Sequence, residues 1–277
     1  MCRNNNESVM NMIEAIKTRK SVRTFDGRMI DVELKQKLLL YAKHIENPFG
    51  IPVEFKFLDA KEHGLVCPVV NGTDLYVGAK IKNIPNACVA FGYSFELFVL
   101  YAQLLGLGTV WLGGTMNRPA FENAMDLDEN EMMPCASPVG YAAKKMSMRE
   151  SMMRKAIKAD ERLPFEELFY DETINTPLTK EQAGCWKEPL EMVRLAPSAV
   201  NKQPWRVIVK DNVIHFYLKR SKGLEKESTL DMQMIDMGIA LCHFALGANE
   251  YNLNIEFMQM DPNLSLDMEY VASYKIR

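Results

Sequence analysis

Two short segments in opposite halves of the 277-residue chain constrain its fold more than any other feature. Residues 19–23 read Arg-Lys-Ser-Val-Arg, and residues 196–205 read Ala-Pro-Ser-Ala-Val-Asn-Lys-Gln-Pro-Trp. The first, called the basic segment below, offers guanidinium and hydroxyl donors of the kind that bind a phosphate group. The second, the proline loop, places polar side chains between two prolines. If both contribute to one ligand site, the fold must bring together segments that are far apart in the chain.

Each segment also has a purely structural interpretation. The basic segment can be a solvated helix end, where the helix dipole favours cationic side chains. The proline loop can be a turn that packs Trp205 into the core. The two segments taken together, and in this order, favour the ligand-binding interpretation.

The composition is that of an ordinary globular protein, with 48% apolar and 25% charged residues. The net charge of −3 provides no broad basic field for nucleic acid or anionic lipid. The six cysteines form no Cys-x-x-Cys pair and the four histidines do not cluster with them, so we expect no metal site or disulfide framework. Residues 3–8 are polar and no apolar run of a signal peptide follows them, which predicts a cytoplasmic protein.

Residues 99–116 are almost entirely apolar, but they contain four glycines and Gln103. A membrane-spanning helix needs about 20 consecutive apolar residues. We therefore expect a buried helix, a turn and a buried strand in this stretch, and no membrane partner.

Hydrophobic periodicity predicts alternating helices and strands along the chain. Helices are expected at residues 9–18, 31–45, 94–105, 180–196 and 232–251. Strands are expected at residues 55–58, 87–92, 109–112, 136–141, 206–210, 213–218, 255–260 and 270–276. Residues 71–78 and 224–230 are expected to be pocket-lining loops, and residues 144–162 a charged connector that packs on the surface.

The second half of the chain weakly repeats the first. Similar segment pairs are 54–59 with 206–211, 105–109 with 251–255, and 139–142 with 272–275. The offset is about 130–150 residues in each pair, which favours duplication of one large unit over a solenoid of short repeats.

These segments, in this order, resemble the FMN-dependent nitroreductases. Residues 19–25 are similar to the family's N-terminal phosphate motif, and residues 196–205 to its second motif. Residues 106–114 look like its flavin-edge segment, and residues 138–141 followed by 162–164 look like its C-terminal end. The resemblance implies an α+β fold with antiparallel-rich mixed sheets flanked by helices, with FMN as cofactor and NAD(P)H as electron donor.

The resemblance places cationic residues around the phosphate and the flavin. The residues implied around the phosphate are Arg19, Lys20, Ser21 and Arg162. Arg23 is implied near the pyrimidine edge of the flavin, where a cation stabilises the charge that develops on reduction and raises the reduction potential.

Further contacts to the flavin are implied from two sides. Gly113 and Gly114 would let the backbone approach the ring closely. The residues implied on the other side are Pro197, Ser198 and Asn201. The flavin itself carries the chemistry, so no catalytic side chain and no metal are assigned.

Two departures from the family pattern indicate a fused pair of units. Residues 47–52 read Asn-Pro-Phe-Gly-Ile-Pro where the first half should carry its own copy of the proline loop. The second half has no Arg-Lys-Ser-x-Arg string ahead of Thr179. This resembles a pseudo-dimeric nitroreductase with units at residues 1–172 and 173–277, the second shorter and with a degenerate phosphate motif. One FMN per chain is expected, in a chain that can act as a monomer because its dimer interface is internal.

The resemblance implies a two-step reaction. NAD(P)H reduces the flavin and leaves, and a nitroaromatic, quinone or similar small acceptor is then reduced at the same face. Two alternatives stay open at this point. One is a flavin-binding sensor or store without turnover. The other is a flavoenzyme of the same fold with a different reaction, such as dehydrogenation or reductive dehalogenation.

Overall fold

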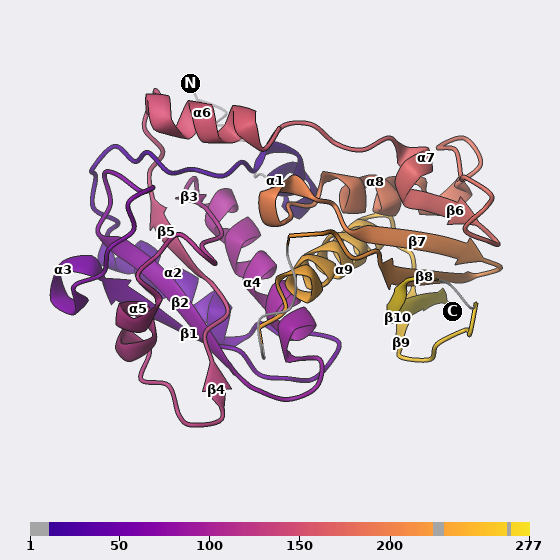
Figure 1. Cartoon of the computed structure of the whole chain (residues 1–277), viewed down its shortest axis with the longest axis horizontal. Coiled ribbons are helices and arrows are strands. Elements are labelled where there is room, and N and C mark those ends of the chain that lie inside the picture. Colours follow the sequence, from indigo (N-terminus) through magenta and orange to yellow (C-terminus); the bar gives the residue numbers. More distant parts are fainter. Residues whose placement is uncertain (1–10, 224–229, 265–266) are drawn as a thin grey trace, which may run out of the picture.

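The structure is a computed structural model that describes residues 11–223, 230–264 and 267–277. Two sheets lie on either side of a central pair of long helices, α4 (Ala87–Leu104) and α9 (Met232–Glu250) (Figure 1). One continuous set of buried side chains extends from the first sheet through both helices to the second sheet. This arrangement confirms the expected α+β fold of two units packed around an internal interface.

The first sheet has the strand order β1-β2-β5-β3, and β4 pairs with β2 beside this path. Every described pairing within it is antiparallel. Its strands are β1 (Glu54–Asp59), β2 (Leu75–Lys82), β3 (Gly108–Thr109), β4 (Glu131–Met132) and β5 (Ala136–Gly140).

The second sheet has the strand order β6-β7-β8-β10-β9. β6 pairs with β7 in parallel, and the other described pairings are antiparallel. Its strands are β6 (Phe169–Asp171), β7 (Trp205–Lys210), β8 (Val213–Leu218), β9 (Ile255–Met258) and β10 (Glu269–Ile276). The turn between β7 and β8 falls at Asp211-Asn212, as the sequence predicts.

Apart from β6, the second sheet repeats the connectivity of the first. α4 joins β2 to β3 as α9 joins β8 to β9. The last strand of each unit, β5 or β10, then inserts between the two strands that its long helix connects. Identical order in both sheets is what duplication of one unit produces, and it agrees with the weak sequence repeat.

β6 belongs to the predicted first unit by sequence but to the second sheet by pairing. The connector that contains α6 (Met148–Ala156) and α7 (Phe165–Leu168) runs from the first sheet across to the second (Figure 1). The end of the first unit therefore completes the sheet of the second. The unit boundary after residue 172 stays a prediction.

The remaining helices pack on the outer faces and on the central pair. Three of them begin after residues that cap the first turn. The side chain of Asn11 accepts from the N–H of Glu14 at 2.9 Å, that of Asp31 from the N–H of Leu34 at 2.7 Å, and that of Asp59 from the N–H of Lys61 at 2.8 Å. These helices are α1 (Met12–Thr18), α2 (Val32–Lys43), α3 (Ala60–His63), α5 (Arg118–Ala124) and α8 (Lys187–Leu195), with short 3₁₀ turns η1 (Gly184–Trp186) and η2 (Ala199–Asn201).

The predicted strand at residues 87–92 is wrong, because these residues form the first turns of α4. A short continuous apolar run fits a buried strand and a buried helix equally well. Here the run continues without a break to Leu104, and most of its side chains are buried between the two units. Among the described residues, α4 alone is long and apolar enough to cross a membrane by length and composition, and 72% of that stretch is buried inside the fold.

Two further expectations are corrected. The helix predicted at 180–196 starts only at Lys187, because Gly184, the first residue of η1, adopts a left-handed φ of 54° that interrupts regular helix. Residues 71–78 are not one loop, since Leu75 begins the central strand β2. The other predicted loop, 224–230, lies outside the described residues except for its last residue.

Two glycines allow α4 and α9 to approach closely. A Cβ atom on Gly92 of α4 would collide with the carbonyl oxygen of Ile235, and one on Gly238 of α9 would collide with the carbonyl oxygen of Val89. The missing side chain of each glycine thus leaves room for the backbone of the opposite helix. The two collisions are reciprocal, as expected for equivalent helices that cross at a pseudo-twofold axis.

We expect Gly238→Ala to destabilise the protein. An added methyl raises helix propensity by about 1 kcal/mol, but overpacking against backbone costs about 1–3 kcal/mol or more because the facing helix must move. The net result should be a loss of about 1–2 kcal/mol in the free energy of unfolding, measured by urea denaturation. Gly114→Ala is the control, since a Cβ there meets no atom within 4 Å. Equal stability of both variants would contradict the packing argument.

Candidate functional site

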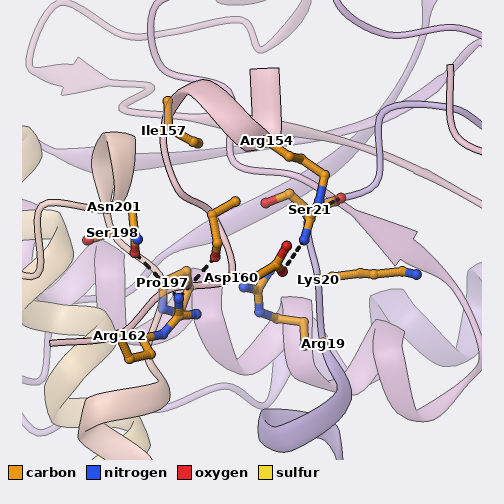
Figure 2. A pocket seen from close by; sticks show the side chains of 11 residues that line it. Arg19, Lys20, Ser21, Arg154, Ile157, Asp160, Arg162, Pro197, Ser198 and Asn201 are labelled. Atoms are coloured by element: carbon orange, nitrogen blue, oxygen red, sulfur yellow. Dashed lines mark hydrogen bonds and ion pairs between the residues drawn. The ribbon is translucent and has the colours of Figure 1, made fainter. Parts of the chain in front are cut away.

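A cavity of about 70 Å³ lies where the basic segment, the connector and the proline loop meet (Figure 2). The first unit and the connector line one side and the second unit lines the other. The lining residues are Arg19, Lys20, Ser21, Arg154, Ile157, Ala159, Asp160, Arg162, Pro197, Ser198 and Asn201. Segments from both halves of the chain therefore meet at one site.

The basic segment is held in an extended conformation against the first sheet. α1 ends at Thr18, and Ser21 then forms a parallel bridge with Thr109 of β3. The N–H of Val22 donates to the carbonyl oxygen of Thr109 at 2.9 Å. A Cβ on Gly108 would lie 2.8 Å from the Val22 side chain, so only glycine allows this close approach. The backbone of the segment is therefore held along the edge of the sheet.

Arg19 is buried beside α4. Its side chain is 6% exposed, and its Nε lies 3.9 Å from Oε1 of Glu96 on α4. The same carboxylate lies 2.9 Å from Nε2 of His243 on α9 and accepts from Nε1 of Trp111 at 3.0 Å. Burial lowers the pKa of Arg19, and the charge of Glu96 opposes this shift. Its Nη1 is buried without a hydrogen-bond partner.

Arg162 approaches the cavity from the connector. Its Nη1 donates to the carbonyl oxygens of Ala159 at 3.0 Å and Glu161 at 2.9 Å, and its Nη2 donates to that of Leu195 at 3.2 Å. Its Nε is buried and has no partner. Burial, followed by the nearby charge of Arg19, lowers the pKa of Arg162 to about 10. The proximity of these cations is unfavourable by itself, and an anion between them would relieve it.

The proline loop has a strained backbone. Val200 and Asn201 have left-handed φ values of 42° and 58°, which are unusual for residues with a side chain and costly for a β-branched one. The Asn201 amide holds the conformation by donating to the carbonyl oxygens of Lys158 at 2.7 Å and Glu161 at 3.0 Å. The loop of the second unit is thereby attached to the connector of the first.

Seven of the ten predicted site residues line this one cavity: Arg19, Lys20, Ser21, Arg162, Pro197, Ser198 and Asn201. The other three do not line it. The backbone N–H of Arg23 donates to Oε1 of Glu150 at 3.1 Å, and the carbonyl oxygen of Gly113 accepts from Arg118 at 2.6 Å. Gly114 has open space around it. The predicted contacts of these three residues with a flavin stay predictions.

Arg154 and Asp160 also line the cavity, although no sequence motif singles them out. Arg154 lies on α6, donates from Nη1 to the carbonyl oxygen of Ser21 at 3.3 Å and pairs with Asp160. Residues 144–162 were interpreted as surface connector because they are charged. The position of Arg154, eight residues before the predicted Arg162, is the one signal that the sequence offers.

Asp236 on α9 was also missed. Its Oδ1 accepts from the N–H of Ala199 in the proline loop at 2.9 Å, while its Oδ2 is buried without a partner. Burial raises the pKa of this carboxyl well above the usual value, against the opposing effect of the Ala199 hydrogen bond. The folded protein therefore disfavours the charged form of this carboxyl relative to the unfolded chain.

Comparison with known proteins identifies the family of the chain. A family model described as "Putative TM nitroreductase" matches residues 11–248. The chain belongs to this nitroreductase family. None of the curated proteins matches the chain significantly.

Solved structures also resemble this nitroreductase. A protein described as a putative nitroreductase from Thermotoga maritima is 19% identical with a TM-score of 0.64, and the match covers 100% of this chain and 97% of that one. It shows the same fold over the full length. A nitroreductase family protein from Clostridium difficile 630 is 18% identical with a TM-score of 0.45, covering 57% of this chain and 96% of that one. An FMN-dependent nitroreductase from Clostridium difficile R20291 is 17% identical with a TM-score of 0.41, covering 51% and 94%.

The buried carboxyl of Asp236 leads to a prediction about pH. Because its folded-state pKa is raised, the unfolded chain loses this proton at a lower pH than the folded chain does. The wild type should therefore lose stability relative to Asp236→Asn as the pH rises from about 4 to 7. Urea denaturation at several pH values measures the difference in the free energy of unfolding.

The control for that experiment is Asp128→Asn, which removes an exposed carboxylate. If the difference in the free energy of unfolding between Asp236→Asn and the wild type stays constant from pH 4 to 7, the buried-acid interpretation is contradicted.

Proposed function

We propose that this nitroreductase binds FMN and passes reducing equivalents from NAD(P)H to a small acceptor such as a nitroaromatic or a quinone. The observation that carries the proposal is the convergence of Arg19, Arg154 and Arg162 from the first unit and connector onto the proline loop of the second unit. Membership of a nitroreductase family supports the reaction class.

The donor set of the cavity fits the phosphate of FMN. Arg19 and Arg162 each have a buried nitrogen without a hydrogen-bond partner, and such atoms cost free energy unless a ligand satisfies them. A phosphate dianion supplies acceptors for several donors at once and offsets the repulsion among the cations. Ser21 and Ser198 add hydroxyl groups from the two units.

The bound FMN would supply two-electron chemistry that no side chain of the chain provides. The residues of the chain would bind and orient it. Arg23, the last residue of the basic segment, has buried Nε and Nη1 atoms without partners, so it is a cation with free donors. A cation beside a flavin ring stabilises the reduced form, which supports the role that the sequence suggests for Arg23.

Reduction of bound flavin separates an enzyme from a flavin store. We expect the purified protein with FMN to lose its flavin absorbance when NADH or NADPH is added without oxygen, and to regain it when a quinone or nitroaromatic is added. Stopped-flow absorbance with each donor and a panel of acceptors measures both steps. Bound FMN that neither donor reduces would favour the store, and reduction without turnover on these acceptors would favour a different flavin reaction.

We further propose one FMN per chain, because the equivalent loop of the first unit is packed differently. Residues 47–52 lie between α2 and β1, as the proline loop lies between α8 and β7. The ring of Phe49 packs edge-on against Phe257 of β9, with centroids 5.0 Å apart. The side-chain amide of Asn47 donates to the hydroxyl of Ser94 at 3.0 Å and to the carbonyl oxygen of Ile51 at 2.7 Å. This loop is therefore packed against α4 and β9 by its own side chains and is only partly buried.

The expected stoichiometry is one FMN per chain, measured as flavin absorbance per mole of protein after reconstitution. Arg162→Gln should weaken FMN binding about 10-fold or more, because it removes a charge-assisted hydrogen bond. Arg28→Gln is the control, since Arg28 is exposed and stacks on Tyr141 away from the cavity. A ratio near two, or equal FMN affinity of the two variants, would contradict the single site.

A further inference from the structure

One acidic side chain lies among the cations of the cavity. Asp160 is the single aspartate or glutamate among the described lining residues, which also include Arg19, Lys20, Arg154 and Arg162. Its carboxylate forms an ion pair with Nη2 of Arg154 (Figure 2). The Arg154 side chain is 10% exposed, whereas that of Asp160 is 82% exposed. The pair thus joins a buried cation to a solvated acid.

The backbone holds Asp160 in this position. The N–H of Ala159 donates to the carbonyl oxygen of Arg154 at 2.9 Å, which returns the chain to the end of α6. Lys158 has a left-handed φ of 50°, and its carbonyl oxygen accepts from the Asn201 amide. The turn that carries Asp160 is therefore fixed to the proline loop of the other unit.

An anion that enters the cavity competes with this carboxylate. Arg154 already donates from Nη1 to the carbonyl oxygen of Ser21, so its Nη2 is the donor that pairs with Asp160. A phosphate that binds Arg154 must therefore either displace the Asp160 carboxylate or lie next to it. In the second case the two negative charges repel each other.

We propose that Asp160 is a built-in competitor for the anion site and lowers its affinity for phosphate-bearing ligands. The identity of the ligand as FMN rests on the proposed function, but the competition itself does not. When Asp160 is displaced, its exposed carboxylate regains water at little cost, whereas Arg154 stays buried and gains the phosphate. Asp160 therefore moderates binding without blocking it, and FMN held in this way can exchange.

The expected change in FMN affinity is modest because the Asp160 side chain is exposed. Ion pairs with an exposed partner contribute little, and here the loss of repulsion toward the incoming phosphate adds to the loss of the pair. We expect Asp160→Asn to bind FMN about three- to tenfold more tightly than the wild type. Affinity for riboflavin, which lacks the phosphate, should not change.

Glu161→Gln is the matched control. Glu161 is the next residue in the same turn, it pairs with Lys158 at 3.2 Å on the surface, and it does not line the cavity. Both variants remove one negative charge, so a general change in the electrostatic field would affect them equally. Only local competition predicts that Asp160→Asn alone tightens binding.

The experiment titrates the full-length wild type and both variants with FMN, riboflavin and inorganic phosphate, by calorimetry or by flavin fluorescence. Tighter FMN and phosphate binding in Asp160→Asn alone, with riboflavin unchanged, supports the proposal. Unchanged or weaker anion binding in Asp160→Asn, or equal gains in both variants, overturns it. If phosphate binds and responds as expected but FMN does not bind, the proposed function fails while the competition stands. If no anion binds to any of the three proteins, both fail.

Discussion

The close crossing of α4 and α9 is the contact on which the rest of the structure depends. Gly92 and Gly238 remove the two side chains that would hold the helix backbones apart. Dispersion and apolar burial act over short distances, so this approach lets the side chains of both helices join one core. Each sheet then covers the outer side of its own helix (Figure 1). The interface between the units is thus part of one continuous core.

One buried carboxylate, that of Glu96, connects the helix crossing to the candidate site. Glu96 comes from α4 and His243 from α9, both fully buried, and they meet 2.9 Å apart. Glu96 also faces Arg19, whose guanidinium lines the cavity. A buried charge is tolerated only when partners compensate its desolvation, and here the partners come from both units. The position of a cavity cation is therefore linked to the relative placement of the two halves.

Much of the fold could be predicted because local signals agreed with the tertiary structure. The helix cap at Asp31 and the turn at Asp211-Asn212 each depend on interactions between residues that are close in the sequence, so both could be predicted from it directly. Residues 87–92 were misassigned because burial on all sides erases the periodicity that separates helix from strand. The family motifs brought seven site residues together, since they are contiguous strings. Arg154, Asp160 and Asp236 act through contacts made only after folding, and no string of neighbours identifies them.

The asymmetry between residues 47–52 and the proline loop has an evolutionary consequence. In a symmetric homodimer, one codon change alters both interfaces at once, so a substitution that suits one face must also suit its twin. A fused chain encodes the two faces separately. Phe49 packs on Phe257 while Asn201 makes polar contacts, because in a fused chain the two loops are encoded separately and can change independently. Covalent fusion thus allows the two halves to specialise, one for packing and one for ligand contact.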